Sequence, residues 1–404
     1  MKEFKNFSQP IKIRIALRFL TTFSNTAVMP FVVLFFVEQI GSTLTTILTV
    51  FIGVAGIAGG LLGGKLADTY GRKKFILIGE LLTAIGFLIV TLSNIGGNIF
   101  IVGSVLGFLI IYFFSSLSQP AYSAFIIDET NEENRKSVYS FMMWTAYLAF
   151  ALGSATGGLL FAAYKIELFL FVGLCSLISF ICVAIWIPES FIKPETLVVS
   201  ETSSQVKKDN QYVAMLKKPI FLILAYISFI FALMDNQIGY YLSLRYFDLF
   251  SEQSYQLLGF LRTENTVISV VFLLWITQKL KKYKEINTAI MGAILFFIGY
   301  VLLSFFVEPI YLYFAMLIVS VGEIVLFPSI QTITANMIPD DQRASYYSVL
   351  GVFSTIGGLC ASFFMILMHV LPSSGFTILF AIIGIISMLV LYKLRVIQLS
   401  GTNT

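Results

Sequence analysis

The stretch 63–74 reads GGKLADTYGRKK and places four basic side chains and one acid between two long apolar runs. Charge is scarce on either side of it for about 20 residues, the length that crosses a bilayer as a helix. We therefore interpret it as a short polar turn that joins two membrane-spanning helices on one side of the membrane.

The composition of the whole chain supports this interpretation. The protein has 404 residues, of which 58% are hydrophobic and 12% charged, whereas soluble domains contain about 45–50% and 25%. Backbone polar groups in lipid must be paired within their own segment, so each span is expected to be helical. The first span follows a short charged leader and is longer than the apolar core of a signal peptide, so we expect it to be retained. The twelve expected spans are residues 13–37, 44–66, 75–95, 99–127, 138–163, 167–187, 219–243, 255–278, 287–306, 310–336, 345–370 and 374–394.

Lysine and arginine fall almost entirely into one set of alternate loops. The chain has 26 of these residues, and all but four lie in this set of loops or at the two termini. The four exceptions are Lys165 and Arg245, which lie in the opposite loops, and Arg18 and Arg262, which lie within spans. Arg18 is expected to extend toward the polar end of its helix. Because positively charged loops remain inside the cell, we expect both termini to be cytoplasmic. The net charge of +4 follows from this asymmetry, and no nucleic-acid partner is expected.

A long polar stretch separates the sixth and seventh spans and divides the chain. We expect an N-terminal six-helix half at 1–188, a cytoplasmic linker at 189–218 and a C-terminal six-helix half at 219–404. An even number of spans makes the two halves cross the membrane in the same direction, as in parallel-repeat transporters. We then expect a site between the halves, near the midplane. Residues that recur at an offset of 208 are Pro120 and Pro328, Arg135 and Arg343, Ser137 and Ser345, Tyr139 and Tyr347, and Ser140 and Ser348.

The polar turn also carries a family signature. The residues that fit the pattern G-x-L-x-D-x-x-G-R-K are Gly64, Leu66, Asp68, Gly71, Arg72 and Lys73. This pattern resembles the signature loop of the major facilitator superfamily, which implies an all-α membrane protein with 12 transmembrane helices in a 6+6 arrangement. Gly64 is expected to allow close helix approach and Gly71 a tight turn, while Asp68 pairs with Arg72 or a helix N-terminus. In the alternative interpretation, the basic residues only set the topology.

Four further stretches narrow the resemblance. They are MKEF at 1–4, AFIIDETNEENRKSVY at 124–139, MDNQ at 234–237 and GEIVLFPSIQT at 322–332. Together they resemble the drug:proton antiporter group of the superfamily, although the helix-five pattern G-P-x-x-G-G of that group reads GSATGG at 153–158. The resemblance implies proton-driven export of lipophilic, often cationic, compounds. It also implies that Asp68, Asp128, Asp235 and Glu323 take part in proton and drug binding.

Ionisable residues within the C-terminal spans point to a site independently of the family. Asp235, Arg262, Glu264 and Glu323 lie within expected spans, where each charge costs roughly 2.5 kcal/mol or more. Three carboxylates with one arginine leave an excess of negative charge, which suits a site that alternately binds a proton and a cation. The alternative for Arg262 and Glu264 is a structural role, in which they neutralise the other carboxylates and hold helices together.

The acids of the N-terminal half have more than one interpretation. Asp128 and its counterpart Asn336 at the 208 offset are an acid and its amide analogue at the cytoplasmic ends of two helices. Asp128 is therefore a candidate gate residue, or else it forms a simple helix-end ion pair with Arg135. Gly64, Asp68, Gly71, Arg72 and Lys73 of the polar turn are separate gate candidates, because a charge network there can hold the inner ends of the helices together in one conformation and release them in another. Glu80 is expected to pair with the basic loop.

Polar and aromatic residues within the spans suggest a substrate pocket. Aromatic residues make up 15% of the chain, and aromatic faces near carboxylates attract organic cations. In the alternative interpretation, these aromatic residues serve helix packing or an interfacial belt, which is the more common role of an aromatic stripe in a membrane helix. The candidate pocket residues are Asn25, Trp144, Tyr147, Asn236, Gln237, Tyr240 and Trp275.

Catalytic chemistry has little support in the sequence. Cys175, Cys182 and Cys360 lie in expected spans, His369 is the single histidine, and no metal-ligand or phosphate-loop spacing occurs. We expect no enzyme activity, no cofactor and no metal. The sequence predicts a monomeric proton-coupled exporter in the plasma membrane, whose partners are small lipophilic substrates, protons and membrane lipids. Alternatives are transport of another solute class, such as a sugar, peptide or lipid, on the same fold, and a membrane receptor or enzyme.

Overall fold

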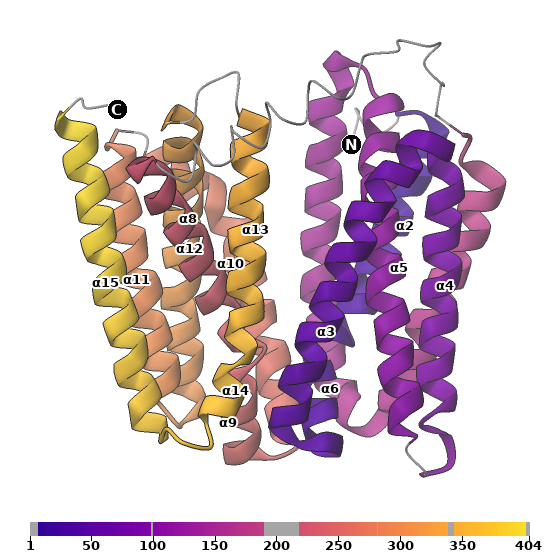
Figure 1. The fold of residues 1–404 in the computed structure, drawn as a ribbon, viewed down its shortest axis with the longest axis horizontal. Helices are drawn as coiled ribbons and strands as arrows, with labels where there is room; N and C mark the ends of the chain where they lie inside the picture. Colours follow the sequence, from indigo (N-terminus) through magenta and orange to yellow (C-terminus); the bar gives the residue numbers. More distant parts are fainter. Residues whose placement is uncertain (1–6, 98–99, 190–217, 281, 338–342, 401–404) are drawn as a thin grey trace. The chain divides into compact units, whose positions relative to one another are not determined.

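The computed structural model describes residues 7–97, 100–189, 218–280, 282–337 and 343–400, and these residues form helices and connecting turns without any strand (Figure 1). This confirms the all-helical prediction. The first elements are α2 (Gln9–Thr26), η1 (Met29–Phe31), α3 (Val32–Tyr70), α4 (Arg72–Leu92), η2 (Ile95–Gly97), α5 (Ile101–Asp128) and α6 (Glu132–Trp186). The later ones are α8 (Pro219–Asp235), η3 (Asn236–Ile238), α9 (Tyr241–Phe250), α10 (Gln253–Leu280), α11 (Glu285–Phe305), α12 (Pro309–Met337), α13 (Arg343–Ser362), α14 (Phe364–Leu367) and α15 (Ser373–Ser400).

Helical segments that can cross a membrane run through the described residues. Nine are long and apolar enough in that part of the chain, and two of them, Gln9–Ala67 with 59 residues and Ser137–Trp186 with 50, are each long enough for two spans. The first bends at Gly41, whose φ is +76°, and the second at Tyr164. Helix α10, which holds Arg262 and Glu264, is not among the nine. When the two long segments are divided at their bends and α10 is added, the described helices match the twelve expected spans.

Local sequence signals explain several helix ends and irregularities. Helix α2 begins with a proline in its first turn, where the missing N–H group costs nothing. Helix α6 begins with a capping box, in which the Asn131 side chain accepts from the Asn134 backbone N–H at 2.9 Å and the Asn134 side chain accepts from Asn131 at 3.1 Å. Pro120 lies inside α5 and Pro328 inside α12, so this pair of residues at the 208 offset occupies interior positions of long helices in both parts of the chain.

The chain divides into two compact units. Unit 1 comprises Met1–Lys193 and Glu252–Thr263, and unit 2 comprises Pro194–Ser251 and Glu264–Thr404. In unit 1, α4 packs on α5 and α6, α3 on α5, and α2 on α6. In unit 2, α11 packs on α12 and α15, and α13 packs on α8.

Small residues bring α3 and α5 together within unit 1. A Cβ atom added to Gly59 would lie 2.1 Å from the carbonyl oxygen of Phe113, and one added to Gly63 would lie 2.1 Å from that of Leu117. At Gly64 the nearest atom to such a Cβ is the Cβ of Pro120 at 3.8 Å, which is an ordinary contact. The close approach expected at Gly64 is thus made by its neighbour Gly63, because Gly63 is the residue that faces α5.

The first part of α10 belongs to unit 1 through specific contacts. The Tyr255 hydroxyl donates to Glu38 Oε1 at 2.7 Å, and the Tyr255 ring packs against Phe31 and Phe161 with centroids 5.9 and 5.5 Å away. The Thr263 hydroxyl donates to the carbonyl oxygen of Ala151 at 3.1 Å. These bonds join a segment that follows the polar stretch in sequence to helices that precede it.

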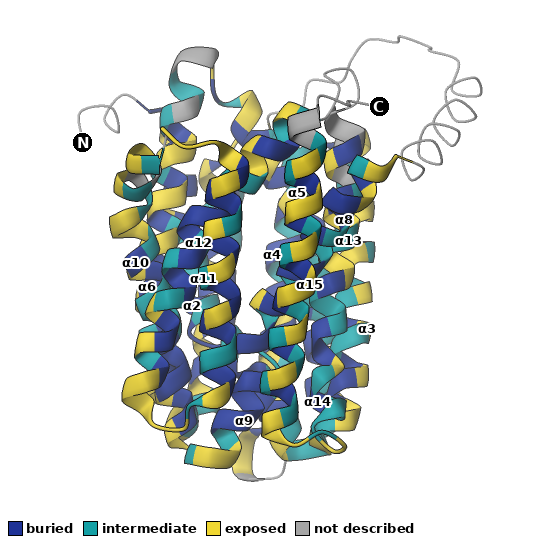
Figure 2. Ribbon diagram, turned by 90° about the vertical axis from the view of Figure 1, so that its left-hand side faces the viewer, coloured by how far each residue is buried: buried dark blue, intermediate teal, exposed yellow. Residues whose placement is uncertain are grey.

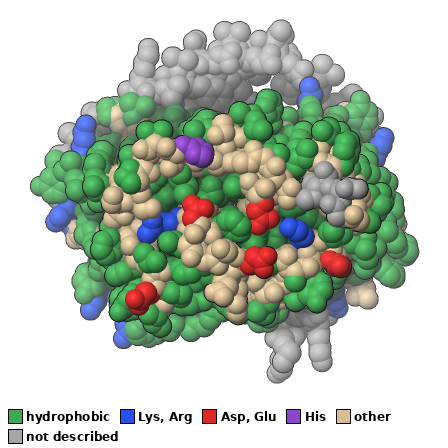
Figure 3. Space-filling model, turned by 90° about the horizontal axis from the view of Figure 1, so that it is seen from below, with side chains coloured by type: hydrophobic (Ala, Val, Ile, Leu, Met, Phe, Trp, Pro, Cys, Tyr) green, Lys and Arg blue, Asp and Glu red, His purple; other side chains and the backbone are tan. Residues whose placement is uncertain are grey.

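Exposed apolar side chains form stripes along the helices, as expected for a surface that lies in lipid. Figure 2 shows helices that carry buried and exposed strips side by side, and the face in Figure 3 has hydrophobic side chains around most of its edge. Such an apolar surface is suited to lipid contact, and the protein is a multi-pass membrane protein. One stripe, on the later part of α6, consists of Leu170, Leu174, Ile178, Ile181 and Ile185.

Candidate functional site

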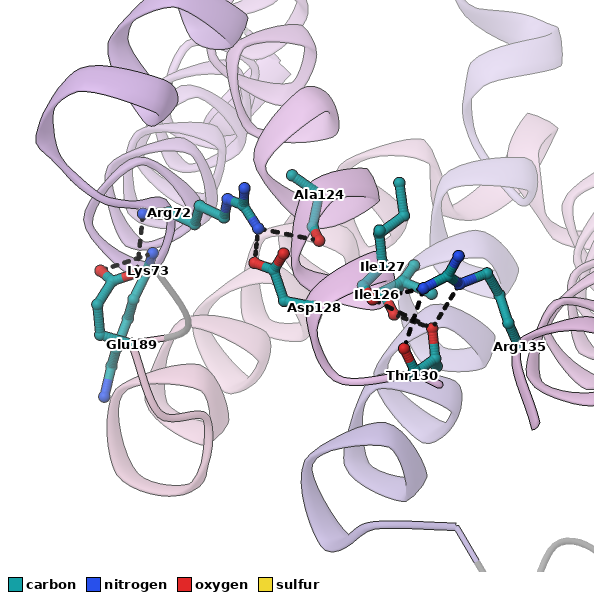
Figure 4. A network of polar contacts seen from close by, with 9 residues as sticks. All are labelled: Arg72, Lys73, Ala124, Ile126, Ile127, Asp128, Thr130, Arg135 and Glu189. Carbon is teal, nitrogen blue, oxygen red and sulfur yellow. Dashed lines mark hydrogen bonds and ion pairs between the residues drawn. The ribbon is translucent and has the colours of Figure 1, made fainter. Parts of the chain in front are cut away.

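Gly71 and Glu189 form the start of α4. Gly71 has a φ of +100°, a conformation that favours glycine, and an added Cβ would lie 2.8 Å from Glu189 Oε2. The Glu189 carboxylate accepts from the backbone N–H groups of Arg72 at 3.0 Å and Lys73 at 3.1 Å (Figure 4). An acid at a helix N-terminus pairs the free N–H groups and complements the helix dipole. The sequence analysis missed Glu189, because it lies 117 positions away from Arg72 in sequence.

The side chains of the same turn tie α4 to α5 and α6. Arg72 forms an ion pair with Asp128 at the end of α5 and donates to the carbonyl oxygen of Ala124 at 3.1 Å. The Lys73 ammonium donates to the carbonyl oxygen of Ala184 in α6 at 2.8 Å. Arg72, Lys73, Asp128 and Glu189 therefore connect one end of three helices, and we call this group the charged latch.

Arg135 lies beside the charged latch but has different partners. It donates to the Thr130 hydroxyl at 3.2 Å and to the carbonyl oxygens of Thr130 and Ile127 at 3.1 and 3.3 Å (Figure 4). The alternative of an Asp128–Arg135 ion pair is wrong for this conformation, since Asp128 pairs with Arg72 and the Arg135 guanidinium closes the α5–α6 turn. The side chain of Asp68, the remaining acid of the signature, lies outside the described residues.

Asp235 and Glu323 form the acidic group of unit 2. Glu323 in α12 is half-buried, and its Oε2 accepts from the Asn265 amide of α10 at 2.8 Å. The same amide donates to the Ser320 hydroxyl at 3.1 Å. Asp235, the last residue of α8, has an exposed side chain and interacts electrostatically with Glu323. Three helices thus bring two carboxylates and one amide together, as the sequence predicted for the two acids but not for Asn265.

Arg262 and Glu264 are separated by the division of α10. Glu264 lies in unit 2, is half-buried and has its Oε2 buried without a hydrogen-bond partner among the described residues. Arg262 belongs to the segment Glu252–Thr263 of unit 1, whereas Glu264 is the first residue of the following segment of unit 2.

The proposed pocket residues have varied surroundings. Gln237 is fully buried, and its amide donates to the carbonyl oxygen of Leu233 at 3.2 Å. Asn236 donates to that of Ala232 at 2.8 Å and lies against Gly358 of α13. The side chains of Trp144, Tyr147 and Trp275 are exposed and that of Tyr240 is half-buried.

Unit 1 contains a polar cavity of about 280 Å³ between α2, α4, α5 and α6. Its lining includes Asn25, one of the candidate pocket residues, together with two arginines and one acid for which the sequence suggested other surroundings. The lining residues are Arg14, Arg18, Thr21, Thr22, Asn25, Thr26, Glu80, Thr83, Ser115, Ser118, Gln119, Tyr122 and Ser176.

The charged residues of the cavity correct three expectations. Glu80 accepts from the Tyr122 hydroxyl at 2.6 Å rather than pairing with the basic loop, because it lies in the middle of α4 facing α5. The Arg14 guanidinium lies 3.5 Å above the Tyr122 ring and is 3% exposed, although the sequence grouped it with the loops. Arg18 lines the cavity instead of extending to the end of its helix.

Comparisons with known proteins agree with this architecture. Residues 15–362 match the Major Facilitator Superfamily. A POT family transporter solved with a thioalcohol-conjugated peptide superposes with a TM-score of 0.73 at 13% identity, covering 99% of this chain and 100% of that one. A D-xylose-proton symporter gives 0.72 at 15% identity, covering 95% and 97%. The protein is a secondary membrane transporter and not an enzyme, and the chain belongs to the major facilitator superfamily.

Three relatives in sequence are named for a transport or resistance function. A Na(+), Li(+), K(+)/H(+) antiporter of Planococcus maritimus is 24% identical over 385 residues, covering 88% of this chain and 89% of its own. The multidrug resistance protein MdtH of Blochmanniella floridana is 24% identical, with coverage of 82% and 80%. Multidrug resistance protein 2 of Bacillus subtilis (strain 168) is 25% identical, with coverage of 79% and 80%.

Proposed function

We propose that this transporter exchanges protons for lipophilic, cationic compounds and exports them from the cell. The observation that carries the proposal is the acidic group of unit 2, in which Asp235 and Glu323 interact and Glu323 accepts a hydrogen bond from Asn265. Two interacting carboxylates bind a proton or an organic cation in turn, since each ligand relieves the same repulsion. The multidrug resistance proteins among the relatives support this class of substrate.

In this mechanism the two halves of the chain rock about a site near the midplane. The halves are residues 1–188 and 219–404, joined by the linker 189–218, and both termini face the cytoplasm. The charged latch holds the ends of α4, α5 and α6 together in one conformation and releases them in the other. Asp68, Arg135, Arg262 and Glu264 are further candidates for gating or coupling. The protein acts as a monomer in the plasma membrane.

A second candidate function uses the same carboxylates for a smaller ligand. The Planococcus relative is a Na(+), Li(+), K(+)/H(+) antiporter and matches most of this chain. Carboxylate oxygens are hard ligands for such ions, and the interacting side chains of Asp235 and Glu323 provide them.

Transport in proteoliposomes tests the proposal. Vesicles loaded with DNA and given a pH gradient should accumulate ethidium, and the accumulation should stop when an ionophore collapses the gradient. Glu323→Gln and Asp235→Asn should abolish it, because an amide takes up no proton at neutral pH. Glu308→Gln, which removes an exposed acid just before α12 in the same unit, should transport like the wild type.

Two outcomes contradict the proposal. If folded wild-type protein moves no ethidium under any gradient, the organic-cation substrate is wrong. If Glu323→Gln and Glu308→Gln transport equally, the coupling site is wrong. Na+ or K+ can be added to the same vesicles. If the added ion dissipates the pH gradient and ethidium does not move, the result supports the alkali-cation function instead.

A further inference from the structure

The polar cavity of unit 1 has no role in the proposed function, yet it contains more positive than negative charge. Arg14 and Arg18 lie one helical turn apart on α2 and both line it, while Glu80 is its one acid. The Glu80 carboxylate accepts from Tyr122 at 2.6 Å, and no ion pair joins it to either arginine in the described part of the chain. The balance of charge in the cavity is therefore positive.

The two arginines retain hydrogen-bonding capacity inside the protein. The Nε atoms of Arg14 and Arg18 are buried and without a hydrogen-bond partner among the described residues. A buried donor without a partner costs free energy comparable to a lost hydrogen bond, and two like charges at this spacing repel each other. An anion bound in the cavity offsets this repulsion and offers acceptor oxygens to the two guanidinium groups that line it.

The cavity also has the size and chemistry of a ligand site. Its volume of about 280 Å³ is close to the lower end of the ~300–1,000 Å³ range of small-molecule sites. The guanidinium group presents several N–H donors in one plane, which matches the paired oxygens of a carboxylate or phosphate. The Asn25 amide and the Thr83 hydroxyl, which also line the cavity, add neutral polar groups around such an anion.

We propose that this cavity binds the carboxylate or phosphate group of a small ligand through Arg14 and Arg18. The ligand is an organic acid, inorganic phosphate or the headgroup of an anionic lipid, which share this oxyanion chemistry. The lining residues all belong to unit 1, whereas the acidic group belongs to unit 2, so the transporter recognises anionic compounds in addition to cations. The inference rests on the geometry of unit 1 and not on the direction of transport.

Direct binding to the purified full-length protein in detergent tests the site. The probe is radiolabelled benzoate, and the competitors are benzamide and benzamidine, which have nearly the same shape but are neutral and cationic. We expect benzoate to bind and both competitors to displace it at least about tenfold less effectively than unlabelled benzoate. Equal displacement by all three compounds would overturn the proposal, because charge would then play no part.

Variants of the two arginines connect binding to the cavity. Arg18→Gln, at a half-buried position, should weaken benzoate binding about tenfold or more, and Arg18→Lys should recover part of it. Arg14→Gln should act in the same direction. The matched control is Lys74→Gln, which removes an exposed positive charge from the same unit and should bind like the wild type. Wild-type binding by Arg18→Gln would contradict the assignment even if Arg14→Gln does not fold.

Competition identifies the source of the oxyanion. Displacement of benzoate by inorganic phosphate supports a free anion as the ligand. Displacement by solubilised phosphatidylglycerol, but not by phosphate, supports a lipid headgroup in the same site. If folded protein binds neither benzoate, phosphate nor phosphatidylglycerol, the cavity holds only water and the inference is wrong.

Discussion

At the scale of single residues, Gly71 has two reasons to be glycine. Its φ of +100° is unfavourable for any other residue, and a Cβ atom would meet Glu189 at 2.8 Å. We expect Gly71→Ala to cost about 1–3 kcal/mol in backbone strain and also to displace the carboxylate that caps α4. The melting temperature of the detergent-solubilised protein should fall.

The control for this variant is Gly41→Ala. Gly41 also has a positive φ, of +76°, but an added Cβ would meet no atom within 4 Å. It therefore measures backbone strain without the clash, and its melting temperature should lie between those of the wild type and Gly71→Ala. A smaller effect at Gly71 than at Gly41 would show that Glu189 does not stabilise the start of α4.

Residues that the sequence predicted well are those whose role depends on their neighbours in the chain. Gly71 was predicted from its place in the polar turn, whereas Arg72, expected as a partner of Asp68, forms an ion pair with Asp128 of another helix. Glu189, Asn265 and Tyr122 were missed, because each acts on a residue more than 40 positions away. Hydropathy and spacing carry no information about which faces of two helices meet, so these partners required the structure.

At the scale of elements, the contact between α11 and α12 depends on glycine. A Cβ atom on Gly322 would lie 2.5 Å from the backbone nitrogen of Phe296, and one on Gly292 would lie 2.6 Å from that of Leu326. Gly322 directly precedes Glu323, so any shift of α12 at this point moves the acidic group. The close packing thus positions the carboxylate as well as the helices.

We expect Gly322→Ala to destabilise the protein by about 1–3 kcal/mol through overpacking and to slow ethidium accumulation in proteoliposomes. Gly351→Ala is the matched control, since it lies in α13 of the same unit and an added Cβ would meet no atom within 4 Å. Its melting temperature and transport should equal or exceed those of the wild type. Equal behaviour of the two variants would contradict a role for the α11–α12 contact.

The helices and their division into spans were largely predictable, whereas the packing of one helix segment was not. Long apolar runs predicted the spans, and Pro10 and the polar residues before α6 mark two helix starts. The assignment of Glu252–Thr263 to unit 1 was not foreseen. It depends on tertiary packing, about which local sequence preference carries no information.

At the scale of the whole molecule, the distribution of lysine and arginine predicts the orientation in the membrane. In a variant with Cys175, Cys182 and Cys360 replaced by serine, a single cysteine at Lys74 should react with a membrane-impermeant maleimide only after the cells are permeabilised. A cysteine at Glu308 should react in intact cells. Both positions have exposed side chains, so a reversed labelling pattern would mean that the termini face outward.

The central claim is that one set of carboxylates exchanges protons for a cationic compound. The most direct measurement is the internal pH of proteoliposomes that contain pyranine and start without any pH gradient. Ethidium added outside should drive protons out of vesicles that contain the wild type or the Glu308→Gln variant. It should not do so in vesicles that contain Glu323→Gln. If ethidium enters and the internal pH stays constant, or if Glu323→Gln still moves protons, exchange at Asp235 and Glu323 is contradicted.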